Sequence, residues 1–133
     1  MRKMRLYEIF IQRQRSSFEN GYYFESAWFT YSILEDRAVS MLRQSGEIGN
    51  LRMLGPKIAE LKTRLPNDAY LRGATLDGLI IDEMYTWKER RNILMYRMAE
   101  GTISIEDIDK EIFLIANVGI KLIVTVQPTL RGY

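Results

Sequence analysis

Hydrophobic residues recur along most of this chain at intervals of three and four residues, the spacing that places them on one face of an α-helix. The stretches with this pattern are residues 2–18, 22–45, 56–65, 74–100 and 105–126. The β-branched run 123–126 could form a strand, but the chain has no second strand candidate to pair with it. The pattern therefore predicts an all-α fold, a bundle of about four to five helices.

The residues at the expected helix ends fit this interpretation. Gly21, Gly46 and Gly101 each follow a hydrophobic repeat, and glycine commonly ends a helix. Ser104 can cap the start of the last helix, because its hydroxyl can accept a hydrogen bond from a free backbone N–H group. Pro128 is expected to end the same helix.

Length and composition restrict the chemistry further. The 133 residues fit one domain, 1–133, with a hydrophobic core of its own. The chain contains no cysteine and no histidine, which excludes disulfides, thiolate metal sites and the commonest general base at neutral pH. We therefore expect neither a metal nor a cofactor.

Charge and hydropathy indicate a cytoplasmic protein. The net charge of +2 is too small to indicate nucleic-acid binding by itself. The chain begins without the apolar segment of a secretory signal. Its most apolar stretch, 112–126, is too short to span a membrane and contains Lys121. No contact with a membrane is expected.

Two charged residues lie in the middle of apolar helix faces when the helices are wound at ~100° per residue. The residues within about 40° of Glu35 are Trp28, Tyr31, Val39 and Leu42. The residues within about 40° of Arg91 are Ile80, Met84, Trp87, Met95 and Met98. Because an unpaired buried charge costs several kcal/mol, we expect Glu35 and Arg91 to form an ion pair. Such a pair could simply fix how the helices pack, or it could orient the arginine towards an anion.

The neighbours of Arg91 favour a binding surface. Asn92, Tyr85 and Tyr96 lie on the adjacent arc of the same helix. A guanidinium, an amide and phenol groups together can bind a phosphate or a nucleotide. The tyrosines could equally pack along the edge of the core.

The segments 87–96 and 31–37 resemble the HEPN superfamily (higher eukaryotes and prokaryotes nucleotide-binding domains). Its signature is an arginine, usually a polar residue next, and a histidine after an intervening four to six residues. Arg91 and Asn92 match this signature, and Tyr96 stands where the histidine is expected. Glu35 matches an acidic residue that commonly faces the arginine. The likeness covers most of the chain as helix order, but only these two segments as residues.

The resemblance implies an all-α bundle that acts on RNA. Active members of the family are metal-independent endoribonucleases, in which the arginine holds the phosphate and the histidine moves protons. Members are typically homodimers whose motif helices face each other. Many belong to toxin–antitoxin pairs or anti-phage systems.

The missing histidine changes the expected activity. Tyrosine has an ordinary pKa near ~10, so Tyr96 would be a weak base. Glu35, Glu83 and Glu89 are candidate substitutes. The favoured hypothesis is a HEPN-like protein with a degenerate ribonuclease site, which binds RNA, a nucleotide or a partner protein through Arg91, with Asn92, Glu35 and Tyr85 among the binding residues.

Two alternatives stay open. In the first, the protein is an active endoribonuclease that uses Arg91 and Tyr96. In the second, it is a structural or accessory helical protein of a phage or mobile element, or an antitoxin-like partner. The second alternative would use the apolar stretch 112–126 as its interface.

Overall fold

The computed structural model describes residues 2–73 and 78–130, and every regular element in these ranges is helical. The prediction of an all-α bundle is confirmed. The elements are α1 (Arg2–Glu19), α2 (Tyr23–Ser45), α3 (Leu54–Arg64), the short 3-10 helix η1 (Leu65–Asn67), α4 (Ala69–Gly73), α5 (Gly78–Glu100) and α6 (Ile105–Leu130).

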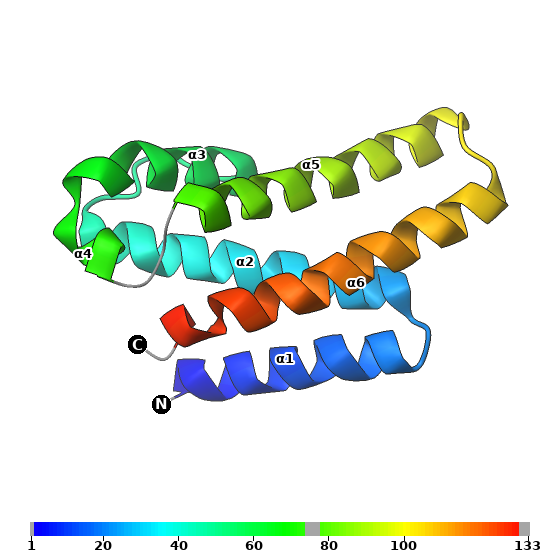
Figure 1. Ribbon diagram of the computed structural model, residues 1–133, viewed down its shortest axis with the longest axis horizontal. Helices are drawn as coiled ribbons and strands as arrows, with labels where there is room; N and C mark the ends of the chain where they lie inside the picture. The colour runs from blue at the N-terminus through cyan, green and yellow to red at the C-terminus, as the bar shows by residue number, and fades with distance from the viewer. Residues whose placement is uncertain (1, 74–77, 131–133) are drawn as a thin grey trace.

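The long helices α1, α2, α5 and α6 run along the length of the molecule, and the shorter α3 and α4 lie at one end (Figure 1). Helix α6 packs against both α2 and α5, while α1 packs mainly along α2. Helix α3 contacts α2 and α5. Helix α3 is therefore close to both of the helices that carry the predicted site.

Several helix ends form as the sequence predicts. Gly21 ends α1 with a φ of 82°, and the Tyr22 N–H group donates to the Ser17 carbonyl at 2.8 Å. Gly101 ends α5 in the same way, with a φ of 69°, so both helices close with the left-handed glycine that this motif favours. The Ser104 hydroxyl accepts a hydrogen bond from the Asp107 N–H group at 3.1 Å, which confirms the predicted cap of α6.

Three boundaries differ from the prediction. Helix α3 begins at Leu54, two residues before the expected start, and residues 65–73 form the unpredicted η1 and α4. Helix α4 is capped by Asp68, whose carboxylate accepts a hydrogen bond from the Leu71 N–H group at 3.1 Å. Helix α6 ends at Leu130, so Pro128 lies inside its last turn instead of stopping it. The expected start of α5 at residue 74 falls outside the described residues.

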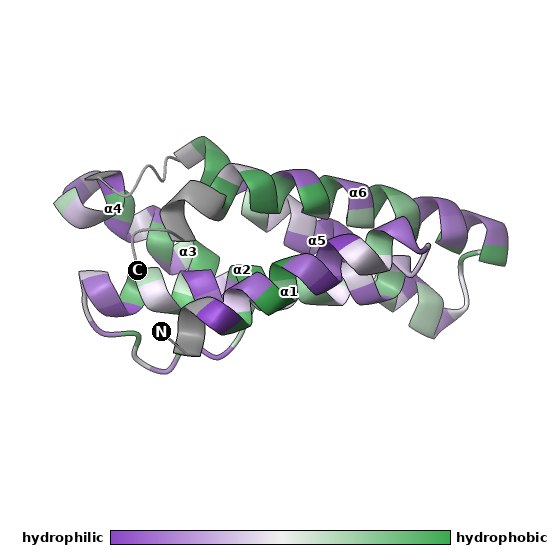
Figure 2. Ribbon diagram, turned by 90° about the horizontal axis from the view of Figure 1, so that it is seen from below, coloured by the Kyte–Doolittle hydropathy of each residue, from purple (hydrophilic) through white to green (hydrophobic). Residues whose placement is uncertain are grey.

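The core is built from aliphatic side chains on the inner faces of the helices. Hydrophilic and hydrophobic residues alternate in bands along the helices (Figure 2), as expected for amphipathic elements. The leucine and isoleucine side chains that are at most 1% exposed are Ile33, Leu34, Leu42, Leu54, Ile58, Leu61, Leu71, Ile81, Leu94, Ile115 and Ile123.

A buried polar layer crosses the middle of the bundle. The Gln14 amide of α1 donates to the Thr30 hydroxyl of α2 at 2.8 Å and to the Gly119 carbonyl of α6 at 3.3 Å. One turn earlier on α6, the Ile115 carbonyl accepts a hydrogen bond from the Trp87 indole of α5 at 2.9 Å. A Cβ atom at Gly119 would lie only 2.7 Å from the Thr30 hydroxyl, so glycine allows the close approach of α6 to α2.

Candidate functional site

Arg91 lies half-buried in the second half of α5, and its side chain reaches Tyr31 of α2. Its guanidinium carbon is 4.4 Å from the centroid of the Tyr31 ring, and its Nη1 donates to the Asn92 side-chain oxygen at 3.0 Å. A guanidinium held against a ring keeps further N–H donors for other ligands. The guanidinium of Arg91 therefore contacts both its sequence neighbour Asn92 and Tyr31 of α2.

The predicted ion pair between Glu35 and Arg91 is wrong. Glu35 Oε1 lies 3.5 Å from Lys57 Nζ of α3, and among the described residues no ion pair joins Glu35 to Arg91. Tyr31 and Glu35 are one turn apart on α2, so two cations from different helices contact successive turns of the same face. Helix α3 lies beside α2 at this point and supplies Lys57 as the ionic partner of Glu35, so Arg91 of α5 does not take that place.

The helical wheel misplaced the buried face of α2. Trp28, which the wheel put in the core stripe, is 57% exposed, and Tyr31 and Glu35 are half-buried. The buried positions of α2 include the small residues Ser26, Ala27, Thr30, Ala38 and Ser40. A buried helix face that is predicted from hydrophobic residues alone leaves out small and polar residues. On α2 these small residues are the ones that allow α6 to pack closely.

The buried cation of α2 is a residue that the sequence analysis did not single out. Arg37 is only 2% exposed, and its guanidinium carbon lies 5.6 Å from the centroid of the Tyr7 ring of α1. Its position between α1 and α2 marks it as part of the helix packing. Its burial could have been predicted from the sequence, because Arg37 lies seven residues after Thr30 and three after Leu34 and therefore on the same helix face as these two buried residues.

Two buried lysines, Lys57 and Lys88, lie near the beginning of α3. Lys57 and Lys88 are 6% and 8% exposed. Lys88 Nζ lies 2.9 Å from where a Cβ atom at Gly55 would be, so α5 packs tightly against the start of α3 at this point. The residues Tyr31, Glu35, Lys57, Lys88 and Arg91 are called the Arg91 face below.

Tyr85 and Glu89 hold the head group of Lys88. Lys88 Nζ donates to Glu89 Oε1 at 2.7 Å and lies 4.3 Å from the centroid of the Tyr85 ring. The hydrogen bond from Lys88 lowers the pKa of Glu89, and a hydrogen bond from Tyr85 and the charge of Lys88 act in the same direction. Because its pKa is lowered and its carboxylate accepts a hydrogen bond from Lys88, Glu89 is a weaker base than an ordinary glutamate and a poor candidate for the missing base.

Tyr96 is 68% exposed and lies about 140° around α5 from Arg91. It shares a helix face with Asn92 instead, one turn away. Glu83 is also distant from Arg91, because it borders a groove on another side of α5. The structure thus does not gather Tyr96, Glu83 and Arg91 around one point.

The charges of the Arg91 face are unequally neutralised. Glu35 is paired with Lys57, and Glu89 is paired with Lys88. Arg91 has no carboxylate partner among the residues that the structure describes, and its contacts are a ring and a neutral amide. Its positive charge is therefore available to an anion from outside the protein.

A shallow hollow of about 340 Å³ runs along α2 beside this arginine. It is lined by Trp28, Tyr31, Ser32, Glu35, Asp36 and Val39. Its aromatic members can stack on flat groups. The sequence analysis named this set only in part, since it placed Trp28, Tyr31 and Val39 in the core.

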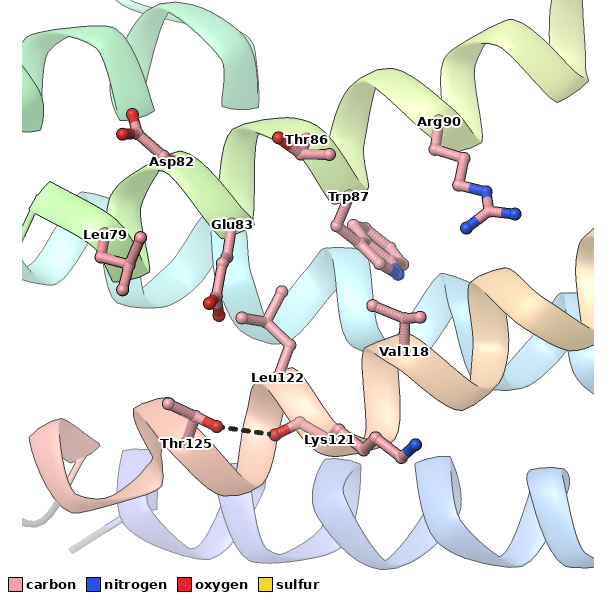
Figure 3. Close-up of a pocket in the computed structure, with 10 residues that line it drawn as sticks. All are labelled: Leu79, Asp82, Glu83, Thr86, Trp87, Arg90, Val118, Lys121, Leu122 and Thr125. Carbon is pink, nitrogen blue, oxygen red and sulfur yellow. Dashed lines mark hydrogen bonds between the residues drawn. The ribbon is translucent and has the colours of Figure 1, made fainter.

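A second depression lies between α5 and α6 (Figure 3). This groove has a volume of about 410 Å³ and is lined by Leu79, Asp82, Glu83, Thr86, Trp87, Arg90, Val118, Lys121, Leu122 and Thr125. Part of the apolar stretch 112–126 borders it, while Ile112, Ile115 and Ile123 of that stretch are buried in the bundle. The stretch is therefore mainly core, with one exposed side.

The described residues contain no cluster of three or more acidic side chains that could hold a metal ion. Over the same part of the chain, no helix has the length and hydropathy needed to cross a membrane. No family model, no curated protein and no solved structure matches this chain.

Proposed function

We propose that the Arg91 face binds a phosphate-bearing ligand, RNA or a nucleotide, and does not cleave it. The observation that carries this proposal is that Arg91 is ordered by Tyr31 and Asn92 without being neutralised by a carboxylate. An arginine arranged in this way can offer paired N–H donors to a phosphate.

The aromatic residues beside Arg91 support a nucleic-acid ligand over a simple anion. Trp28 is 57% exposed and lines the hollow next to Tyr31. Exposed aromatic rings next to cations are the usual means of holding unpaired bases, because every base has a face on which a ring can stack. The hollow would receive a base while Arg91 holds the phosphate next to it.

The positions of the candidate bases support binding over cleavage. Proton transfer requires a group within hydrogen-bond reach of the reacting hydroxyl. Tyr96 lies on a different side of α5 from Arg91, and Glu89 is bound to Lys88. We therefore expect no cleavage of RNA in the presence of a chelator, either by the wild type or by Tyr96→Phe.

Fluorescence anisotropy with a labelled single-stranded RNA of mixed sequence tests the proposal. Arg91→Ala should weaken binding about tenfold at low salt, because it removes a charged contact to phosphate. Arg97→Ala is the matched control, since it removes the same charge from the same helix about 120° away. Arg97 is exposed, and its guanidinium donates to the backbone carbonyl of Thr102 in the following loop.

The results separate the outcomes as follows. A loss that is confined to Arg91→Ala supports the Arg91 face. Equal losses in both variants would indicate attraction by overall charge and contradict the proposal. Wild-type protein without affinity for RNA or for a labelled nucleotide at low salt would also contradict it.

The biological setting belongs to the same proposal. A non-cleaving HEPN-like protein would act in the cytoplasm, within a toxin–antitoxin, anti-phage or mobile-element system. A partner protein of the antitoxin kind and a homodimer are implied by the resemblance in the same way.

A further inference from the structure

The open face of α2 extends beyond the hollow that lies beside Arg91. Thr30 packs against α6, and Trp28 and Ser32 lie about 160° around α2 from it, so they face away from α6 and line the hollow. Arg91 reaches one edge of this face through its contact with the Tyr31 ring. Helix α1, which packs along α2, forms the opposite edge.

Aromatic rings connect the open face of α2 to α1. The rings of Trp28 and Phe29 pack edge to face, with 5.2 Å between their centroids. The Phe29 ring in turn lies 5.8 Å from the ring of Phe10, which belongs to α1. Trp28 is exposed, and Phe29 and Phe10 are half-buried. These three residues, called the aromatic strip below, continue the hollow as far as α1.

An exposed arginine lies at the α1 end of the aromatic strip. Arg13 follows Phe10 by three residues, so the two side chains are neighbours on one side of α1. Arg13 is exposed and forms no ion pair with any residue that the structure describes. None of the residues three or four positions from it on α1 is acidic. The strip therefore has a cation without an acidic partner at each end, Arg91 and Arg13.

The polar residues between the two arginines suit bases better than phosphates. Ser32 and Asp36 line the hollow in this part of α2. A carboxylate repels a phosphate, but it accepts hydrogen bonds from the amino groups of bases. A strand that crosses α2 would therefore place its bases over the middle of the face and its phosphates at the two edges.

We propose that a single-stranded RNA of several nucleotides crosses α2 along the aromatic strip, from Arg91 to a second phosphate site at Arg13. This inference rests on the proposed function and narrows its ligand, because a mononucleotide cannot reach both arginines. Rings on which bases stack, with cations that follow the backbone, are typical of surfaces that bind single strands without sequence preference. A duplex keeps its bases stacked on one another, so it could not use the rings.

Anisotropy titrations with labelled adenosine monophosphate and with a labelled mixed-sequence RNA of about eight nucleotides test this route. Arg13→Ala should weaken RNA binding about fivefold, the effect of losing one exposed charged contact, and leave the nucleotide affinity unchanged. It should also reduce the slope of log affinity against log salt by about 0.7, the value for one phosphate of a single strand. Arg15→Ala is the matched control and should change neither affinity, because it removes the same charge from an exposed position about 160° around α1.

A change in the aromatic strip provides the second measurement. Phe29→Leu keeps an apolar side chain in the packing of α1 against α2 but removes the ring. We expect it to weaken binding of the longer RNA about fivefold, at the lower end of the effect of losing one stacked base. Phe113→Leu is its control, since Phe113 packs on Tyr23 in a separate group of rings on α6. Circular dichroism would show that each variant keeps its helices.

The possible outcomes decide the proposal. Losses that are confined to Arg13→Ala and Phe29→Leu, and seen only with the longer RNA, support it. RNA binding that depends on Arg91 but is indifferent to Arg13→Ala overturns this route and leaves the proposed function standing. A wild-type protein that binds neither probe contradicts the proposed function, and this inference with it.

Vesicles of phosphatidylserine and phosphatidylcholine provide a further arm of the experiment. A helix with cations and exposed apolar residues can also bind an anionic membrane surface, and Leu6 and Ile9 of α1 are exposed. Vesicle binding that is lost in Arg13→Ala, together with RNA binding that is not, would overturn the RNA route. Absence of vesicle binding, together with the expected loss of RNA affinity, supports it.

Discussion

The guanidinium of Arg91 lies against the ring of Tyr31, with 4.4 Å between its central carbon and the ring centroid. A charged residue at a helix interface is commonly held by an opposite charge, but here an aromatic ring and the neutral Asn92 hold it. The nearby carboxylate of Glu35 is bound to Lys57. The consequence is an ordered cation whose charge has no acidic partner in the described part of the chain.

Energetic independence of Glu35 and Arg91 is the first prediction. In a double-mutant cycle, the effects of Glu35→Gln and Arg91→Met on the free energy of unfolding should add within about 0.5 kcal/mol, because the two residues share no contact. Glu35→Gln alone should destabilise by about 1 kcal/mol, since the buried Lys57 loses its carboxylate. Urea denaturation of the four proteins provides the measurement. The cycle of Glu35→Gln with Lys57→Met should be clearly non-additive, and a larger coupling of Glu35 to Arg91 than to Lys57 would contradict the observed pairing.

The ring of Tyr31 should contribute to binding through its face and not through its hydroxyl. Tyr31→Ala removes the surface against which Arg91 rests, and we expect RNA affinity to fall about three- to fivefold, the effect of losing a modest cation–π contact. Tyr31→Phe keeps the ring and should bind as the wild type does. Anisotropy titrations at constant salt compare the three proteins. If the phenylalanine variant were as weak as the alanine variant, the hydroxyl would be the important group.

Gly119 should be intolerant of a side chain. A Cβ atom there would lie 2.7 Å from the Thr30 hydroxyl and 3.2 Å from the Trp87 indole nitrogen, so Gly119→Ala should lower the free energy of unfolding by about 1–3 kcal/mol through overpacking. Thr30→Ala in the same chain should recover part of this loss by making room. Gly78→Ala is the control, because an added Cβ there meets no atom within 4 Å. Chemical denaturation measures the series, and a neutral Gly119→Ala would contradict the close packing of α2 and α6.

The carboxyl group of Glu89 should titrate below its ordinary pKa of 4.5, chiefly because Lys88 donates a hydrogen bond to the carboxylate. The pKa of Glu89 is lower in the folded than in the unfolded protein. The interaction with Lys88 therefore stabilises the fold when the pH is above the pKa of the unfolded protein, and this stabilisation is lost as the pH falls through the pKa of the folded protein. Lys88→Met should move the pKa of Glu89 back up, while Lys110→Met, a change on α6, should leave it unmoved. A carboxyl-detected NMR titration follows the group directly. An unchanged Glu89 pKa in Lys88→Met would refute the assigned cause.

Much of the fold follows from local patterns that a single helix carries. The glycines at 21 and 101 and the serine at 104 act on the backbone within a few residues of themselves, so their effects can be predicted without knowing what packs nearby. The same holds for the pairing of Asn92 with Arg91, because the two residues are adjacent in the sequence.

The contents of the candidate site depended on neighbours that are far apart in the chain. Whether Glu35 meets Arg91 or Lys57 is decided by where α3 lies, and no pattern within α2 or α5 contains that information. Which face of α2 is buried against α6 depends on Thr30 of α2 and on Gly119 of α6, 89 positions later in the chain. Their small size allows the two helices to pack closely. The sequence by itself thus determined the helices, most of their ends and the presence of an arginine in need of a partner. Only the tertiary structure decided that the partner is Tyr31, because which side chains meet is a property of the packing between helices.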